Sequence, residues 1–159
     1  MSETKCEEPL SWEKYFMGIA IMSAKKSSDE KTKVGSCIVN KYNRIVGIGF
    51  NDMPHGLEGD KELFRKNKCD YVVMSSTNAI LNRNCVDLDN CTLYTTLFPN
   101  NESAKIIIQS RIEKVVFLKE RAEDKDKADA SKKMFEKAGT KFEKYKGDVS
   151  PILLEFQNN

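Results

Sequence analysis

Apolar residues recur with the period of a helix in three long stretches of the chain. Between residues 10 and 26 they stand three or four positions apart, and Ser11 precedes them as a capping residue. The stretches 101–110 and 125–138 repeat this spacing, and Gly139 follows the second of them. Such periodicity predicts amphipathic helices, with serine favoured at the start and glycine just after the end. A shorter segment at 75–81 predicts a further helix.

Runs of β-branched and aromatic residues predict five strands. Two of these runs, 34–39 and 44–50, are separated by four residues and predict a hairpin. Three more follow, and they alternate with the later helices: 91–96, 114–118 and 140–145. Strands that alternate with helices imply crossover connections and a sheet covered on both faces. The pattern therefore predicts an α/β fold.

The remaining segments lack a clear period. Residues 51–69 contain Pro54, Gly56 and Gly59 and predict a long loop, which in a compact domain is often functional. Residues 151–156 are mostly apolar and are expected to dock on the core. We expect a flexible N-terminus at 1–9 and a single domain over 10–157.

Charge and cysteine content narrow the classes of protein. The 26 basic residues against 24 acidic ones are too even for a nucleic-acid-binding protein. The stretch 119–133 alternates in sign and predicts a solvated helix face. No apolar run approaches the roughly 20 residues of a membrane span. The five cysteines form no CxxC pair, so most are expected to be small buried hydrophobes in a cytoplasmic or nuclear protein.

Several ordered stretches together resemble one enzyme family. They are Ser11-Trp12 with Tyr15-Phe16-Met17, then 34–40, 45–54, Asn78-Ala79-Ile80 and Leu97-Phe98-Pro99. On these stretches the chain resembles the deoxycytidylate (dCMP) deaminases along nearly its whole length. The resemblance implies the three-layer α/β/α cytidine deaminase-like fold with a central mixed five-stranded sheet.

The resemblance also allows each chemical position to be compared. Zinc base deaminases carry H-x-E and P-C-x-x-C: the histidine and two cysteines bind zinc, and the glutamate is the general acid/base. Aligned on the family, Met74 takes the histidine position and Ser76 the glutamate position, while Asn100 and Ser103 take the cysteine positions. This comparison predicts vestigial zinc and acid positions, no bound metal or other cofactor, and no catalytic residue.

Three further interpretations concern this region. A substitute zinc site built from His55, Cys69 and Glu102 is conceivable in space, although no spacing supports it. Asn100 is expected to cap the helix that follows it, and Ser75 or Ser76 the preceding helix, because these residue types favour N-caps. Met74 is suited to filling the gap that a metal would leave.

Nucleotide binding depends on a few residues of the long loop. The family holds the substrate sugar at the position of Asn51, which equally suits a turn residue that bonds its own backbone. Arg65 could meet a phosphate. Asp52 stands where the family prefers glycine, and a carboxylate near a phosphate is repulsive, so binding is expected to be weak or absent.

These observations predict a non-catalytic dCMP deaminase-like protein, a pseudoenzyme acting as an oligomeric protein-interaction or regulatory module. Its expected partner is a second copy or another protein, such as an active dCMP deaminase paralogue. The alternative is a nucleotide-binding sensor that retains the pocket without turnover. Less favoured are an active dCMP deaminase, an enzyme with different serine chemistry, and a nucleic-acid-binding protein.

Overall fold

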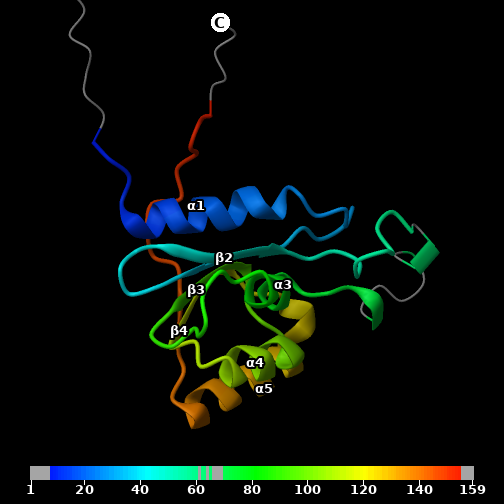
Figure 1. Cartoon of the computed structure of the whole chain (residues 1–159). Coiled ribbons are helices and arrows are strands. Elements are labelled where there is room, and N and C mark those ends of the chain that lie inside the picture. Colours follow the sequence, from blue (N-terminus) through cyan, green and yellow to red (C-terminus); the bar gives the residue numbers. More distant parts are fainter. Residues whose placement is uncertain (1–7, 61, 64, 66–69, 155–159) are drawn as a thin grey trace, which may run out of the picture.

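A computed structural model describes the chain except for residues 1–7, 61, 64, 66–69 and 155–159. Its centre is a sheet in the strand order β2-β1-β3-β4-β5 (Figure 1). Strand β1 is antiparallel to both of its neighbours, whereas β3, β4 and β5 are parallel to one another. The predicted mixed five-stranded sheet is confirmed, with the bounds β1 (Gly35–Val39), β2 (Ile45–Phe50), β3 (Thr92–Leu97), β4 (Lys114–Lys119) and β5 (Lys141–Lys144).

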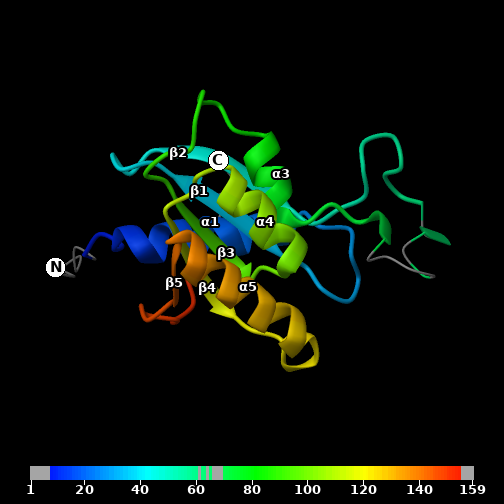
Figure 2. The ribbon, with the colours of Figure 1, turned by 90° about the horizontal axis from the view of Figure 1, so that it is seen from below.

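Helices cover both faces of this sheet. Helix α1 (Trp12–Ala24) lies on one face, and three helices lie on the other (Figures 1 and 2): α3 (Ser75–Leu81), α4 (Asn101–Gln109) and α5 (Lys125–Ala138). A 3₁₀ turn, η1 (Ala122–Asp124), leads into α5. The three-layer α/β/α fold is therefore confirmed. Over the described residues, no helix has the length and apolar character that a bilayer crossing requires.

Alternation along the strands divides the core into two layers. On β1, Cys37 and Val39 pack against α1, while Ile38 between them belongs to the layer beneath α3, α4 and α5. Strand β4 alternates in the same way, with Val116 toward α1 and Val115 toward the other helices. This period-two pattern follows from the pleat of a strand and explains why apolar runs cover both faces.

The ends of the helices agree with the sequence pattern. The Ser11 hydroxyl accepts a hydrogen bond from Lys14 N at 3.2 Å and so caps α1. Gly139 has a φ of 79° directly after α5, a left-handed conformation that favours glycine. Both predicted signals are confirmed.

The predicted loop at 51–69 differs in one respect. Residues 62, 63 and 65 are helical, because the Asp60 carboxylate accepts from the backbone N–H groups of Glu62 and Leu63 at 3.0 and 3.2 Å. The loop interpretation overlooked this cap.

The C-terminal segment also departs from expectation. Residues 151–154 are exposed, Leu153 by 79%, so the prediction that they dock on the core is wrong for this part; residues 155 and 156 lie outside the described residues. Within this segment, the Cδ1 atom of Ile152 approaches α1 at Gly18. A polar contact precedes this segment, since Lys14 Nζ lies 2.5 Å from Asp148.

Candidate functional site

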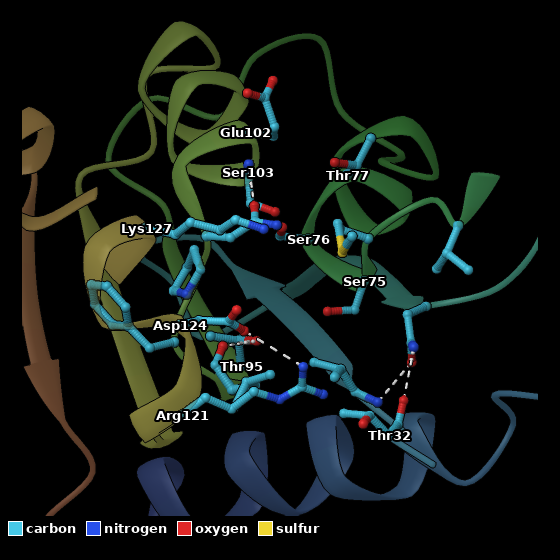
Figure 3. Close-up of a pocket in the computed structure, with 18 of the residues that line it drawn as sticks. Thr32, Ser75, Ser76, Thr77, Thr95, Glu102, Ser103, Arg121, Asp124 and Lys127 are labelled. Atoms are coloured by element: carbon cyan, nitrogen blue, oxygen red, sulfur yellow. Dashed lines mark hydrogen bonds and ion pairs between the residues drawn. The ribbon is translucent and has the colours of Figure 1, made fainter. Parts of the chain in front are cut away.

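A pocket of about 560 Å³ opens beside the carboxyl ends of β3 and β4 (Figure 3). The first turns of α3, α4 and α5 surround it. Residues from the segment before β1 and Asn51, directly after β2, complete this part of the lining. Ligands of open α/β sheets commonly bind outside the carboxyl ends of the strands. The volume also lies within the usual range for small-molecule sites. This pocket is the candidate site.

The four positions singled out by the family pattern come together here. Met74 and Ser76 reach the pocket from the start of α3, and Asn100 and Ser103 from the start of α4. Ser76 and Ser103 are almost fully buried, with exposed fractions of 4% and 3%.

Their local roles agree only in part with the sequence interpretation. Asn100 caps α4, because its Oδ1 accepts from Ser103 N at 2.9 Å; such a cap contributes about 1 kcal/mol. For α3, Met74 itself takes the N-cap position and no side chain caps the helix, so the expected serine cap is wrong. Ser75 instead bonds the Ser36 hydroxyl of β1 at 2.8 Å, and Ser36 bonds Thr95 of β3 at 3.2 Å. Ser75 therefore bonds to a hydroxyl of the adjoining sheet and does not cap its own helix.

The donor atoms at these four positions do not fit a zinc ion. Zinc takes thiolate, imidazole or carboxylate ligands, whereas the chain presents a thioether, two hydroxyls and an amide. The amide oxygen of Asn100 is already engaged by Ser103 N. Within the described ranges, no three histidine, cysteine or acidic side chains gather closely enough to hold a metal ion.

The other proposed zinc ligands do not assemble either. His55 is an exposed residue of the predicted loop, and its Nδ1 lies 3.0 Å from Glu58 Oε1. Cys69 lies outside the described residues. Burial raises the pKa of the Cys37 thiol to about 12 and that of Cys91 to about 11, so both stay protonated at neutral pH. These two cysteines are core residues, as predicted.

The nucleotide-binding candidates are separated by the fold. Asn51 lines the pocket, but its amide is committed to the backbone: Oδ1 accepts from Val34 N at 2.7 Å and Nδ2 donates to Thr32 O at 2.9 Å. Arg65 is exposed on the following segment and is absent from the pocket lining.

The carboxylate of Asp52 points elsewhere. It accepts from the Ser28 hydroxyl at 2.5 Å and from Met53 N at 2.8 Å, and it does not line the pocket. The expected repulsion between Asp52 and a bound nucleotide therefore lacks a structural basis.

Two cations of the site were not recognised from the sequence. Arg121 and Lys127 fall in the stretch interpreted as a solvated helix face. Lys127 is exposed and Arg121 is half-buried, and both also line the pocket. Arg121 pairs with Asp124 at 3.5 Å, and Lys127 extends from the first turn of α5 into the pocket toward Ser76 and Ser103 (Figure 3). Their position just after β4, whose carboxyl end borders the pocket, is the signal that could have identified them.

Comparisons with known proteins place these features in context. A family profile described as "Cytidine and deoxycytidylate deaminase zinc-binding region" matches residues 10–119. The chain is 42% identical to the protein named deoxycytidylate deaminase in Homo sapiens, over 99% of this chain and 94% of the human protein. It is 40% identical to the mouse protein of the same name, with the same coverage.

Solved structures agree on the fold. The dCMP deaminase of cyanophage S-TIM5, in complex with dCMP and dUMP, aligns with a TM-score of 0.69 over 87% of this chain and all of that one. The sequence identity of this pair is 20%. At that identity the likeness shows the cytidine deaminase-like fold and nothing further.

These comparisons contradict part of the sequence interpretation. Relatives that are 40–42% identical over almost the entire chain are named for the enzyme, and the matching profile is that of the zinc-binding region. The prediction of a non-catalytic pseudoenzyme that serves as an interaction or sensor module is therefore wrong, and so is the step from four changed positions to a protein that has lost the zinc-dependent activity of its family. The relatives instead support a dCMP deaminase.

Proposed function

Because this chain belongs to the cytidine and deoxycytidylate deaminase family, we propose that it acts on dCMP in the pocket between α3, α4 and α5. The observation that carries this proposal is the coincidence of two findings. The positions that define the family all line one pocket, and that pocket has the size of a nucleotide site. Relatives named for this substrate match the chain over nearly its full length.

The residues of the chain support the recognition of a pyrimidine base. The hydroxyls of Ser76 and Ser103 provide hydrogen-bonding groups, and the side chains of Phe98 and Ile106 add apolar surface to the same pocket. Pockets for small molecules commonly combine such apolar walls with a few placed polar groups. The family's reaction hydrolyses the 4-amino group with a zinc-activated water and a carboxylic acid. Because the side chains at the four family positions do not fit zinc, the proposal is supported by the hydrogen-bonding and apolar groups of this pocket and by the relatives named deoxycytidylate deaminase.

Calorimetry with dCMP, followed by chromatography for dUMP, tests this proposal. We expect saturable binding of about one dCMP per chain and weaker binding to Ser76→Leu, because the larger apolar side chain enters the pocket and removes a hydroxyl. Ser110→Leu, at the far end of α4, serves as the control and should bind normally. Conversion to dUMP would establish the complete activity, whereas no heat of binding at millimolar dCMP would overturn the proposal.

We also propose that the chain self-associates beside α1. Trp12 and Tyr15 on α1 are 58% and 40% exposed, and Leu153 and Leu154, which follow Ile152 where it approaches α1, are 79% and 55% exposed. Grouped apolar residues on a soluble surface indicate an association site, and symmetric pairing is its commonest form.

Light scattering should therefore give a mass of at least two chains. Leu153→Lys should lower that mass by placing a charge in the contact, while Tyr42→Lys, at the exposed turn between β1 and β2, should not. A mass of one chain at high protein concentration would contradict self-association.

A further inference from the structure

Helix α1 is apolar even on the side that faces away from the sheet. Glu13 and Lys14 are its only charged residues, and both stand near its start. Tyr15, Ile21 and Met22 are exposed on this helix, whereas α5 carries charged residues along its exposed side. A helix that is apolar all round is normally covered on all sides. The outward side of α1 is therefore suited to a further contact.

The C-terminal arm, residues 151–154, adds apolar surface to the same side. Figure 1 shows the end of the described chain passing α1 and leading away from the sheet. Ile152 Cδ1 would lie 3.3 Å from a Cβ placed on Gly18, at the middle of α1. Leu153 and Leu154 follow and are exposed. The arm and the outward side of α1 thus present apolar groups side by side, with Ile152 between them.

Three polar residues fix the base of this arm. The Lys14 ammonium donates to Asp148 Oδ2 at 2.5 Å and to the Ser150 hydroxyl at 2.7 Å. The Ser150 hydroxyl and N–H donate in turn to the Asp148 carboxylate, at 2.5 and 2.8 Å. These contacts, termed the strap, leave the Lys14 side chain only 13% exposed. The strap orders the chain just before the arm, which lowers the entropy that a contact of the arm must overcome.

The two ends of α1 carry opposite charges. Glu8 precedes the helix and Glu13 stands in its first turn, whereas Lys25 and Lys26 follow its last residue. All four are exposed, and none forms an ion pair with another residue that the structure describes. When two copies of α1 run antiparallel, the acidic end of each faces the basic end of the other, whereas a parallel arrangement brings like charges together. This charge complementarity favours a second copy of the chain as the partner.

We infer that a second copy covers α1, with the two α1 helices antiparallel about a two-fold axis near Gly18 and the strap-held arms packed between them. This inference rests on the proposed self-association and specifies its geometry. A two-fold axis makes each contact occur twice. Tyr15 and Met22 lie three positions before and four positions after Gly18, on one side of the helix, so Tyr15 of each copy faces Met22 of the other. Leu153 and Leu154 of each arm then lie in the contact and are removed from water.

Charge-reversal variants test the antiparallel contact. Lys25→Glu combined with Lys26→Glu makes both ends of α1 acidic. Glu8→Lys combined with Glu13→Lys makes both ends basic. Each double variant should associate about 10-fold more weakly than the native chain in analytical ultracentrifugation, because attraction at each end becomes repulsion. An equimolar mixture of the two variants should regain at least the native affinity, because every end then faces an opposite charge. Circular dichroism checks that each variant is folded.

Asp148→Asn tests the strap. It removes the charge to which Lys14 and Ser150 bond, so the arm is less ordered before association, and we expect about 5-fold weaker association. Asp129→Asn, at an exposed position of α5 across the sheet, is the matched control and should associate like the native chain. Trp12 is the only tryptophan of the chain and is exposed on α1. Its fluorescence emission should therefore shift to shorter wavelength as association covers this helix.

The outcomes separate this inference from the proposed self-association. A native chain that stays monomeric at high concentration contradicts self-association, and the inference fails with it. If the native chain associates without a change in Trp12 emission, or if the mixed charge-reversal variants do not regain affinity, only the inference is overturned. An Asp148→Asn variant that associates like the native chain would show that the strap does not order the arm for this contact, and would overturn that part of the inference.

Discussion

Gly49→Ala is expected to lower the free energy of unfolding by about 3 kcal/mol or more, the upper range for overpacking a rigid site. A Cβ at this position of β2 would lie 2.3 Å from Ala79 N and 2.4 Å from Ser75 O. Both atoms belong to the backbone of α3, so no side-chain rotation relieves the clash. The helix must therefore move away from the sheet. This movement displaces Ser75, Ser76 and Thr77, which line the pocket.

Denaturant unfolding followed by circular dichroism measures this effect. Gly18→Ala on α1 is the matched control, because its added Cβ would meet only the Cδ1 atom of Ile152 at 3.3 Å. Alanine is the better helix former by about 0.5–1 kcal/mol, so the control should be neutral or slightly stabilising. A loss below about 1 kcal/mol for Gly49→Ala would show that α3 does not pack on β2 as closely as described.

Asn51→Ala is expected to cost about 3 kcal/mol, because it removes a buried amide and leaves backbone groups without partners. Asn51 is 5% exposed, and its side chain connects the end of β2 to Thr32 and Val34 of the preceding segment. Its Nδ2 also lies 3.4 Å from Asp29 Oδ2. Without it, Val34 N loses its acceptor and the pocket wall formed by these residues loosens.

Asn82→Ala provides the comparison for this variant. The Asn82 amide makes one exposed hydrogen bond to Ile48 O at 3.2 Å, so its removal should cost less than about 1 kcal/mol. Chemical denaturation of both variants gives the two values. Equal losses would indicate that the three contacts of Asn51 contribute little to the stability of the segment.

Much of the fold follows directly from the hydrophobic pattern. The helix at 125–138 and the hairpin around residues 40–43 could be predicted because their periods and turn residues agree with the final packing. Local signals of this kind act within a few residues and survive in the folded protein.

Other features depend on contacts that the local pattern does not contain. Ser75 was expected to cap a helix, but it bonds Ser36, which lies 39 positions earlier in the chain on β1. Lys127 is exposed, as its charged neighbours predict, but only the fold shows that the first turn of α5 also places it at the pocket. Residues 151–154 are apolar and nevertheless exposed.

The functional interpretation illustrates a similar limit. Met74, Ser76, Asn100 and Ser103, the positions taken from the family pattern, line one pocket, and their donor chemistry does not fit zinc. The step from these four residues to a protein without activity was contradicted by relatives that carry the enzyme's name over nearly the whole chain. The residue types at four positions therefore did not determine the function of the whole chain.

The most direct test of the account is an NMR titration of the ¹⁵N-labelled chain with dCMP. If dCMP binds where we propose, saturable shifts should appear at the backbone amides of Ser76, Thr95, Ser103 and Lys127, which line the pocket. The amides of Ile19 and Ser23 lie on α1, across the sheet from the pocket, and should stay in place. The absence of shifts at millimolar dCMP, or shifts confined to α1, would contradict the account.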